Sequence, residues 1–222
     1  MSELTLSVIT SDLLKALWET AIMVGIGLIL SVIVGTPLGF LIFLTRKGML
    51  LQNTFVNFLG GLAVNIVRSL PFVILLILIL PVSQFITGHS TGPIAATVPL
   101  AIASIAFYAR LVEVALCEVD HGVVEASQAL GASVWLTIKE VLLPESLAGL
   151  VRAFTVTAIS LIGYSAMAGV VGGGGIGFLA INYGYYRYET GVMMVTVVTL
   201  ILLVQLVQVS GDSVSAHIDH KS

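Results

Sequence analysis

The sequence has few charged residues and a single cysteine. Only 9% of the 222 residues are charged, with 9 Lys plus Arg against 12 Asp plus Glu, whereas about 25% of the residues of a soluble domain are charged. So few charges argue against a soluble domain. The net charge of −3 offers no basic face for nucleic acid. Because Cys117 is the only cysteine, a disulfide framework is excluded as well.

Hydrophobic residues make up 58% of the chain instead. Residues 20–45 contain no charge, and as a helix they would extend about 39 Å, more than the hydrocarbon core of a bilayer requires. A second, kinked span is expected from about Phe55 to Leu80, bent where Arg68 and Pro71 interrupt it. Further spans are expected over residues 93–111, 147–171 and 190–210. The sequence therefore predicts an all-α polytopic membrane protein with about five transmembrane helices.

Five spans place the two termini on opposite sides of the membrane, and the loop charges indicate which side is which. Cytoplasmic loops are enriched in Lys and Arg. An outer N-terminus leaves only Lys15 and Arg187 outside and places six basic residues inside, namely Arg46, Lys47, Arg110, Lys139, Arg152 and Lys221. We therefore expect an outer segment over residues 1–19, a membrane domain over residues 20–210 and a cytoplasmic tail over residues 211–222.

One predicted cytoplasmic loop concentrates the charge. Nine charged residues lie between positions 110 and 152, namely Arg110, Glu113, Glu118, Asp120, Glu125, Lys139, Glu140, Glu145 and Arg152. The pattern predicts two helices, with Gly131 in a left-handed position after the first and Ser133 as N-cap of the second. The second helix would carry Trp135, Ile138 and Leu142 on one face, and Pro144 would separate it from the next span.

The same loop contains a recognisable signature. Glu125-Ala126-Ser127 is followed after three residues by Gly131, and after nine more by Val141-Leu142-Leu143-Pro144. This spacing resembles the EAA motif of permease subunits of bacterial ABC importers, with Ser127 and Val141 as the two departures. Residues 65–72, 163–167 and 172–177, followed by residues 183–185, look like the methionine-uptake permeases of that family. The resemblance extends from Trp18 to Asp212.

The resemblance implies a role for the loop as a coupling helix, within residues 112–146, that is seated on a cytoplasmic ATPase. The coupling residues would be Glu125, Ala126, Ser127, Gly131, Val141, Leu143 and Pro144. It also implies a permease homodimer in the bacterial inner membrane, two ATPase subunits that carry ATP and Mg, and an extracytoplasmic methionine-binding protein. The chain would be no enzyme itself. Without the resemblance, an ordinary solvated loop with a helical hairpin is the simpler interpretation.

The energy source can be argued from the residues alone. No Asp or Glu lies inside the five predicted spans, which disfavours coupling to protons or sodium through carboxylates. The glycine run at residues 172–177 lacks the lysine of a phosphate-binding loop, so that any ATP must be handled by another polypeptide. The alternatives are a permease for another small amino acid, or a passive channel, which leaves the charged loop unexplained.

Four residues are candidates for the translocation path: Arg68, Tyr164, Ser165 and Met167. An arginine at mid-membrane needs a polar partner or a wet cavity. Arg68 would either contact the carboxylate of a zwitterionic substrate, support the pore wall, or bond the backbone carbonyls freed by Pro71. The resemblance implies that Met167 contributes to a gate, whereas packing is the ordinary use of such a methionine. No metal site is predicted.

Small residues recur at a spacing of four in two places. Gly27, Ser31, Gly35 and Gly39 form a stripe on the first span, and Ser165, Gly169, Gly173 and Gly177 form another. Such spacing lets helix backbones approach closely. We expect the first stripe to pack within one subunit, Pro37 to bend that span, and the second stripe to include irregular backbone in the outer half of the path.

Overall fold

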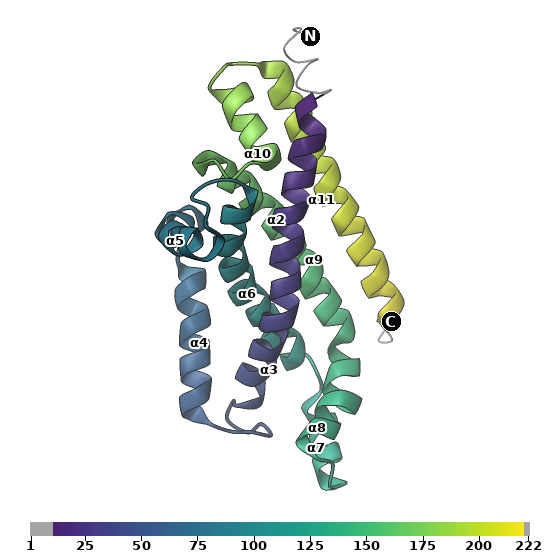
Figure 1. The fold of residues 1–222 in the computed structure, drawn as a ribbon. Helices are drawn as coiled ribbons and strands as arrows, with labels where there is room; N and C mark the ends of the chain where they lie inside the picture. Colours follow the sequence, from purple (N-terminus) through teal and green to yellow (C-terminus); the bar gives the residue numbers. More distant parts are fainter. Residues whose placement is uncertain (1–10, 220–222) are drawn as a thin grey trace.

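The computed structural model describes residues 11–219 as an elongated bundle of helices joined by short turns, with no strand in that part of the chain (Figure 1). The elements in chain order are α2 (Leu13–Leu30), the π-helical turn η2 (Ser31–Gly35), α3 (Thr36–Leu44), α4 (Thr54–Ser69), α5 (Phe72–Thr87), α6 (Pro93–Cys117), α7 (His121–Ala129), α8 (Val134–Thr137), the π-helical turn η3 (Ile138–Leu142), α9 (Leu143–Ala168), the 3₁₀ turn η4 (Gly169–Val171), α10 (Gly175–Leu179), the π-helical segment η5 (Ala180–Tyr185) and α11 (Thr190–Ile218). The predicted all-α class is confirmed.

Four continuous helical stretches within residues 11–219 are long and apolar enough to cross a membrane: Leu13–Leu44, Pro93–Cys117, Val134–Val171 and Thr190–Ile218. The pair α4 and α5 makes a fifth crossing when it is counted as one broken span. The total agrees with the predicted five spans. The predicted spans 20–45 and 190–210 are too short, because the first helix begins at Leu13 and the last helix continues to Ile218.

The expected kinked helix from Phe55 to Leu80 is instead two separate helices. α4 ends at Ser69, α5 begins at Phe72, and their axes turn by 107°. Leu70 at the break adopts an extended conformation, as the residue before a proline favours, so the chain stops being helical there. A proline inside α5, Pro81, does not end that helix. Pro71 was correctly predicted to bend the span, but the bend is a corner rather than a kink.

Two other prolines do not interrupt their helices. Pro37 follows the π-helical turn Ser31–Gly35, and Pro144 follows the π-helical turn Ile138–Leu142. Proline lacks an N–H and collides with the carbonyl four residues earlier, and a wider π turn is a known way to absorb such a disturbance. The expectation that Pro144 separates the loop helix from the fourth span is therefore wrong, since helix continues from Val134 to Val171.

The predicted terminal segments also differ from the structure. α2 begins at Leu13, so residues 13–19 of the expected outer segment belong to the first helix. α11 continues to Ile218, so most of the expected tail is helical as well. The remaining parts of the two segments, residues 1–10 and 220–222, lie outside the described residues.

The core is organised around α6, which contacts α2, α3, α4, α5 and α9. The small-residue stripe of the first span, Gly27, Ser31, Gly35 and Gly39, is buried. A Cβ at Gly39 would stand 2.6 Å from the Ala109 carbonyl oxygen and 2.7 Å from Val112, and one at Gly35 would stand 3.1 Å from the Ile105 carbonyl oxygen. The predicted packing of this stripe within one subunit is confirmed, because α6 lies directly against it.

Replacing Gly39 by Ala is expected to destabilise the bundle by about 1–3 kcal/mol, because the methyl group has no room against the backbone of α6. Gly25 in the same span has open space around its Cβ position, so Gly25→Ala serves as the matched control and should be neutral or slightly stabilising. Unfolding of the two purified variants in detergent measures the difference. Equal stability of both variants would contradict the proposed close packing.

Candidate functional site

The predicted coupling loop lies at one end of the bundle, where α7 and α8 project beyond the other helices (Figure 1). Asp120 caps α7 through a hydrogen bond from the Gly122 N–H, 2.7 Å. Gly131 follows the helix with φ +78°, a left-handed conformation that only glycine adopts without cost. Ser133 then caps α8 by accepting from the Leu136 N–H, 3.3 Å. The predicted C′ glycine and N-cap serine are both confirmed.

Ser127, which stands where the EAA motif has its second alanine, holds the loop together. The Ser127 hydroxyl lies 3.1 Å from the hydroxyl of Thr137 and donates to the Val124 carbonyl, 2.8 Å. Ser127 and Thr137 are both buried. Glu125 and Ala126 are exposed on the opposite side of α7, and Glu125 pairs with His121 at 3.1 Å. Ser127 therefore joins α7 to α8, while its two neighbours are free to face a partner.

The second half of the motif leads into the bundle. Leu142 is fully buried, Val141 is half-buried, and Leu143 and Pro144 are exposed. Leu142 belongs to a cluster with Leu116 and Val124, which connects the loop to the end of α6. The motif thus has one side that anchors the loop and another side that is left uncovered.

The tip of the loop exposes large apolar side chains that the sequence reasoning did not single out for contact. Leu130 is 89% exposed and Trp135 is 70% exposed. Val123 and Leu136 beside them are also exposed. Trp135 was expected to share a face with Ile138 and Leu142, but Trp135 is exposed, whereas Leu142 is buried and Ile138 packs against the same buried cluster. In the sequence, only the proximity of these residues to the EAA motif indicates that they could contact a partner.

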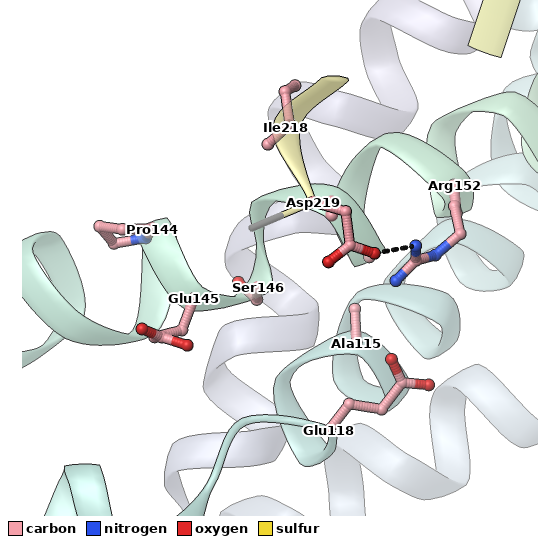
Figure 2. Close-up of a pocket in the computed structure, with 10 residues that line it drawn as sticks. Ala115, Glu118, Pro144, Glu145, Ser146, Arg152, Ile218 and Asp219 are labelled. Carbon is pink, nitrogen blue, oxygen red and sulfur yellow. Dashed lines mark hydrogen bonds and ion pairs between the residues drawn. The ribbon is translucent and has the colours of Figure 1, made fainter. Parts of the chain in front are cut away.

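A pocket of about 230 Å³ opens at the base of the loop (Figure 2). Arg152 donates to Asp219 at 3.2 Å and to the Ser215 hydroxyl at 3.3 Å, and Ser215 in turn bonds the Ala148 carbonyl. Glu118 lies across the pocket from this pair in Figure 2. These contacts fasten the end of α11 to α9, so the last helix is fixed beside the loop.

The candidate path residues of α9 lie on two different faces. Met167 is 46% exposed and shares an uncovered stripe with Val156, Gly163 and Val170. Ser165 is only 2% exposed, and its hydroxyl donates to the Ile162 carbonyl at 2.7 Å. The structure therefore brings Met167 to an open surface and places Ser165 inside the subunit.

Arg68 and Tyr164 come together although they are far apart in the sequence. Both line a small pocket beside the corner between α4 and α5. Arg68 belongs to the last turn of α4 and is exposed, and among residues 11–219 no hydrogen bond or ion pair involves its guanidinium group. The alternative that Arg68 bonds backbone carbonyls freed by Pro71 is therefore wrong. Met167 does not line this pocket.

The glycine run reverses the chain rather than binding a ligand. After α9 ends, Gly172 adopts φ +78° and Gly174 φ +77°, and α10 folds back against the end of α9. A Cβ at Gly169 or Gly177 would collide with backbone, so the second stripe does serve close approach. The N–H groups of Gly175 and Ile176 are bonded by Glu19, 2.8 Å, and Thr20, 3.0 Å, and are not available to a phosphate.

Ser127→Ala is expected to loosen the loop by about 1–3 kcal/mol, because the buried Thr137 hydroxyl loses its partner. Adding Thr137→Val removes the second polar group and should recover part of that loss. Hydrogen exchange of the α7 amides measures both variants, with Ser160→Ala as the control because Ser160 lies on α9 away from the loop. Strictly additive effects of the two substitutions would contradict the proposed bond.

Comparison with known proteins extends the likeness along the whole chain. The model of a family described as "Binding-protein-dependent transport system inner membrane component" matches residues 33–221. The chain is 47% identical over 214 residues to a probable D-methionine transport system permease protein of Vibrio cholerae, with 96% of this chain and 95% of that protein covered. It is 46% identical over 181 residues to the methionine import system permease protein of Bacillus subtilis, with 82% of each chain covered.

Solved structures give the same result. An inward-facing structure of the MetNI methionine ABC transporter contains a chain with a TM-score of 0.93 and 40% identity, covering 99% of this chain and 100% of that one. An amino acid ABC transporter crystallised with histidines matches with a TM-score of 0.80, 98% of this chain and 99% of that one covered, but only 16% identity. The second likeness shows the fold alone.

Proposed function

The chain belongs to the family of binding-protein-dependent transport system inner membrane components, and from this premise we propose that it conducts methionine across the bacterial inner membrane. It is the multi-pass permease subunit of an ABC importer, and ATP hydrolysis belongs to a separate subunit. The observation that supports methionine as the substrate is the similarity, over nearly the full length of both chains, to permeases of methionine transport.

The assembly proposed for this chain follows from the same likeness. Two permease subunits form the membrane part, two cytoplasmic ABC ATPase subunits bind ATP and Mg, and an extracytoplasmic binding protein delivers the amino acid. The absence of carboxylates from the middle of the predicted spans supports ATP as the energy source, because ion-coupled transporters place ionisable groups there.

The loop formed by α7 and α8 is the proposed contact with the ATPase. Glu125, Ala126, Leu143 and Pro144 are exposed, Gly131 sets the turn, and Ser127 and Val141 anchor the loop from within. Leu130 and Trp135 add the apolar side chains that interfaces use as anchors. This arrangement supports a docking element better than an ordinary solvated loop, which has no reason to expose a tryptophan and a leucine together.

The proposed orientation has the N-terminus outside and the loop in the cytoplasm. The turn after α3, which holds Arg46 and Lys47, and the turn η3, which holds Lys139, lie at the end of the bundle where α7 and α8 project, whereas the start of α2, which holds Lys15, lies at the opposite end (Figure 1). The distribution follows the enrichment of basic residues on the cytoplasmic side.

The translocation path is proposed to follow the uncovered face of α9 between the two permease subunits. Met167 would narrow the path, since its flexible and polarizable side chain adapts to a passing substrate. Tyr164 and Arg68 line the neighbouring pocket, and Ser165 supports the helix from the inside. ATP-driven closure of the ATPase pair would move the two subunits as rigid bodies and alternate the access to this path.

Uptake assays in proteoliposomes test the function directly. The permease reconstituted with its ATPase and binding protein should accumulate labelled methionine only when ATP and Mg are supplied to the ATPase. Liposomes that contain the permease alone should show no flux, because a closed gate has no other means of opening. Flux through the permease alone would favour the passive channel, and uptake of another amino acid in preference to methionine would correct the substrate.

Trp135→Ala is expected to weaken the assembly with the ATPase by tenfold or more, because a truncated interface tryptophan typically costs about 2 kcal/mol or more. Trp18→Ala is the matched control, since Trp18 is 69% exposed at the other end of the bundle. Co-purification of the ATPase with each variant measures the effect. Similar recovery with both variants would remove Trp135 from the docking surface.

Met167→Ala is expected to raise the basal ATPase rate of the complex, because a wider constriction reduces the barrier that holds the path closed. Met194→Ala is the control, as Met194 is 59% exposed on α11 and does not belong to the proposed path. Steady-state phosphate release from the two assembled complexes provides the measurement. An unchanged rate in Met167→Ala together with unchanged uptake would exclude the gate role.

A further inference from the structure

The pocket shared by Arg68 and Tyr164 lies at the corner where the second span breaks. It has a volume of about 160 Å³ and combines residues of α4, α5, α6 and α9, namely Val67, Arg68, Leu70, Phe72, Leu75, Ala103, Phe107 and Tyr164. The 107° turn between α4 and α5 creates the corner, because the end of α4 then stands beside the first turn of α5. A continuous helix would leave no such recess.

One charge lines this pocket, and it is positive. Val67 and Leu70 flank Arg68 there, and none of the residues lining the pocket is acidic. No described residue bonds the Arg68 guanidinium group, which offers five N–H donors in a geometry that matches a carboxylate. α5 begins at Phe72 without a side-chain cap, so the positive end of its helix dipole adds to the same potential.

The opposite wall is aromatic. The rings of Phe72 and Tyr164 stack with their centroids 4.5 Å apart and their planes 13° from parallel, and Phe107 lines the same space. Phe72 is buried in the core together with Leu76 and Leu161, which fixes the stack in place. Aromatic rings form favourable contacts with thioether sulfur.

We propose that this pocket is a transient binding site for a free amino acid within each permease subunit. Arg68 binds the α-carboxylate, and the wall formed by Phe72, Tyr164 and Phe107 receives an apolar side chain of the size and softness of a thioether. This proposal rests on the proposed function, in which methionine passes through this subunit. It adds that the permease itself selects the amino acid. The substrate class is an α-amino acid with an unbranched, uncharged side chain.

The pocket is distinct from the constriction. Met167 does not line it, and lies on the exposed stripe of α9 with Val156 and Gly163. Tyr164 is connected with both, because it is next to Gly163 in the chain while its ring lies in the pocket. The pocket and the face of α9 that carries Met167 are therefore neighbours on one helix.

A photoreactive analogue of methionine that carries a diazirine in its side chain tests the site. The permease–ATPase complex is labelled in detergent without the binding protein, so that only selectivity within the complex is measured. Adducts on this chain are mapped by peptide mass spectrometry. Labelling should concentrate on Phe72, Phe107 and Tyr164 and should be displaced by excess methionine. Adducts confined to other parts of the chain would overturn the proposal.

The role of Arg68 is tested by competition with methionine and with methioninamide, which lacks the carboxylate. In the wild-type complex methionine should compete at least tenfold better than the amide. Arg68→Gln should abolish that preference, and Arg68→Lys should retain part of it. Arg187→Gln should leave it unchanged, because Arg187 lies over the Tyr183 ring and does not line this pocket. A merely structural role of Arg68 would lower labelling without changing the preference, and that result would overturn the assignment.

The wall is tested by replacing Tyr164 with Leu, which keeps an apolar side chain but removes the ring. Norleucine, in which a methylene group replaces the sulfur, should then compete as well as methionine, whereas the wild-type complex should prefer methionine. An unchanged preference would overturn the aromatic subsite. Failure of the proposed function is recognised separately, since the wild-type complex would then take up no methionine in proteoliposomes.

Discussion

The structure depends on the close contact between the first span and α6. Gly35 and Gly39 bring the two backbones near enough for the Ala109 carbonyl to occupy the place of a side chain at Gly39, while Gly27 lies against Leu161 of α9. In a bilayer the lipid tails are as apolar as leucine, so helices associate through such close packing rather than through burial of hydrophobic surface. With α2 and α3 on one side, α6 is free to hold α4, α5 and α9 on the others.

This packing also connects the proposed docking loop to the proposed path. The connection from α6 to α9 has to leave the bundle, and it forms the projecting helices α7 and α8. The helix that begins at Val134 continues without a break to Val171, through the π turn that absorbs Pro144. The exposed Trp135 and the exposed Met167 therefore lie on one continuous helix. A displacement of the loop by a partner would reach the path through a rigid element, which is the kind of connection that energy coupling requires.

Polar groups within the helical bundle have assigned partners almost everywhere. The hydroxyls of Ser31, Thr157 and Thr196 bond carbonyls of their own helices, and Glu19 caps the first turn of α10. The guanidinium group of Arg68, in the last turn of α4, has no such partner among the described residues. An arginine without a partner is energetically costly at membrane depth. Transient binding of a carboxylate by Arg68, as proposed for the pocket, would offset that cost.

The membrane class, the position of the proposed docking loop and the local conformations that one residue controls follow from the sequence alone. Scarcity of charge selects the bilayer, the EAA spacing identifies the loop, and Gly131 and Ser133 specify its turn because their conformations depend on immediate neighbours. The break at Pro71 was predictable for the same reason, but the direction of α5 after it was not.

The places where those elements meet depend on the tertiary structure. Local rules predicted that Pro144 ends a helix, and the surrounding packing instead favours a π turn that continues it. Trp135 is left exposed by the packing of the loop, and the 107° corner brings Arg68 to Tyr164. The bond from Ser127 to Thr137 and the cap that Glu19 provides for Gly175 also join residues from separate elements. Such contacts depend on how helices are oriented in space, and a linear pattern of hydrophobicity and charge carries no information about that orientation.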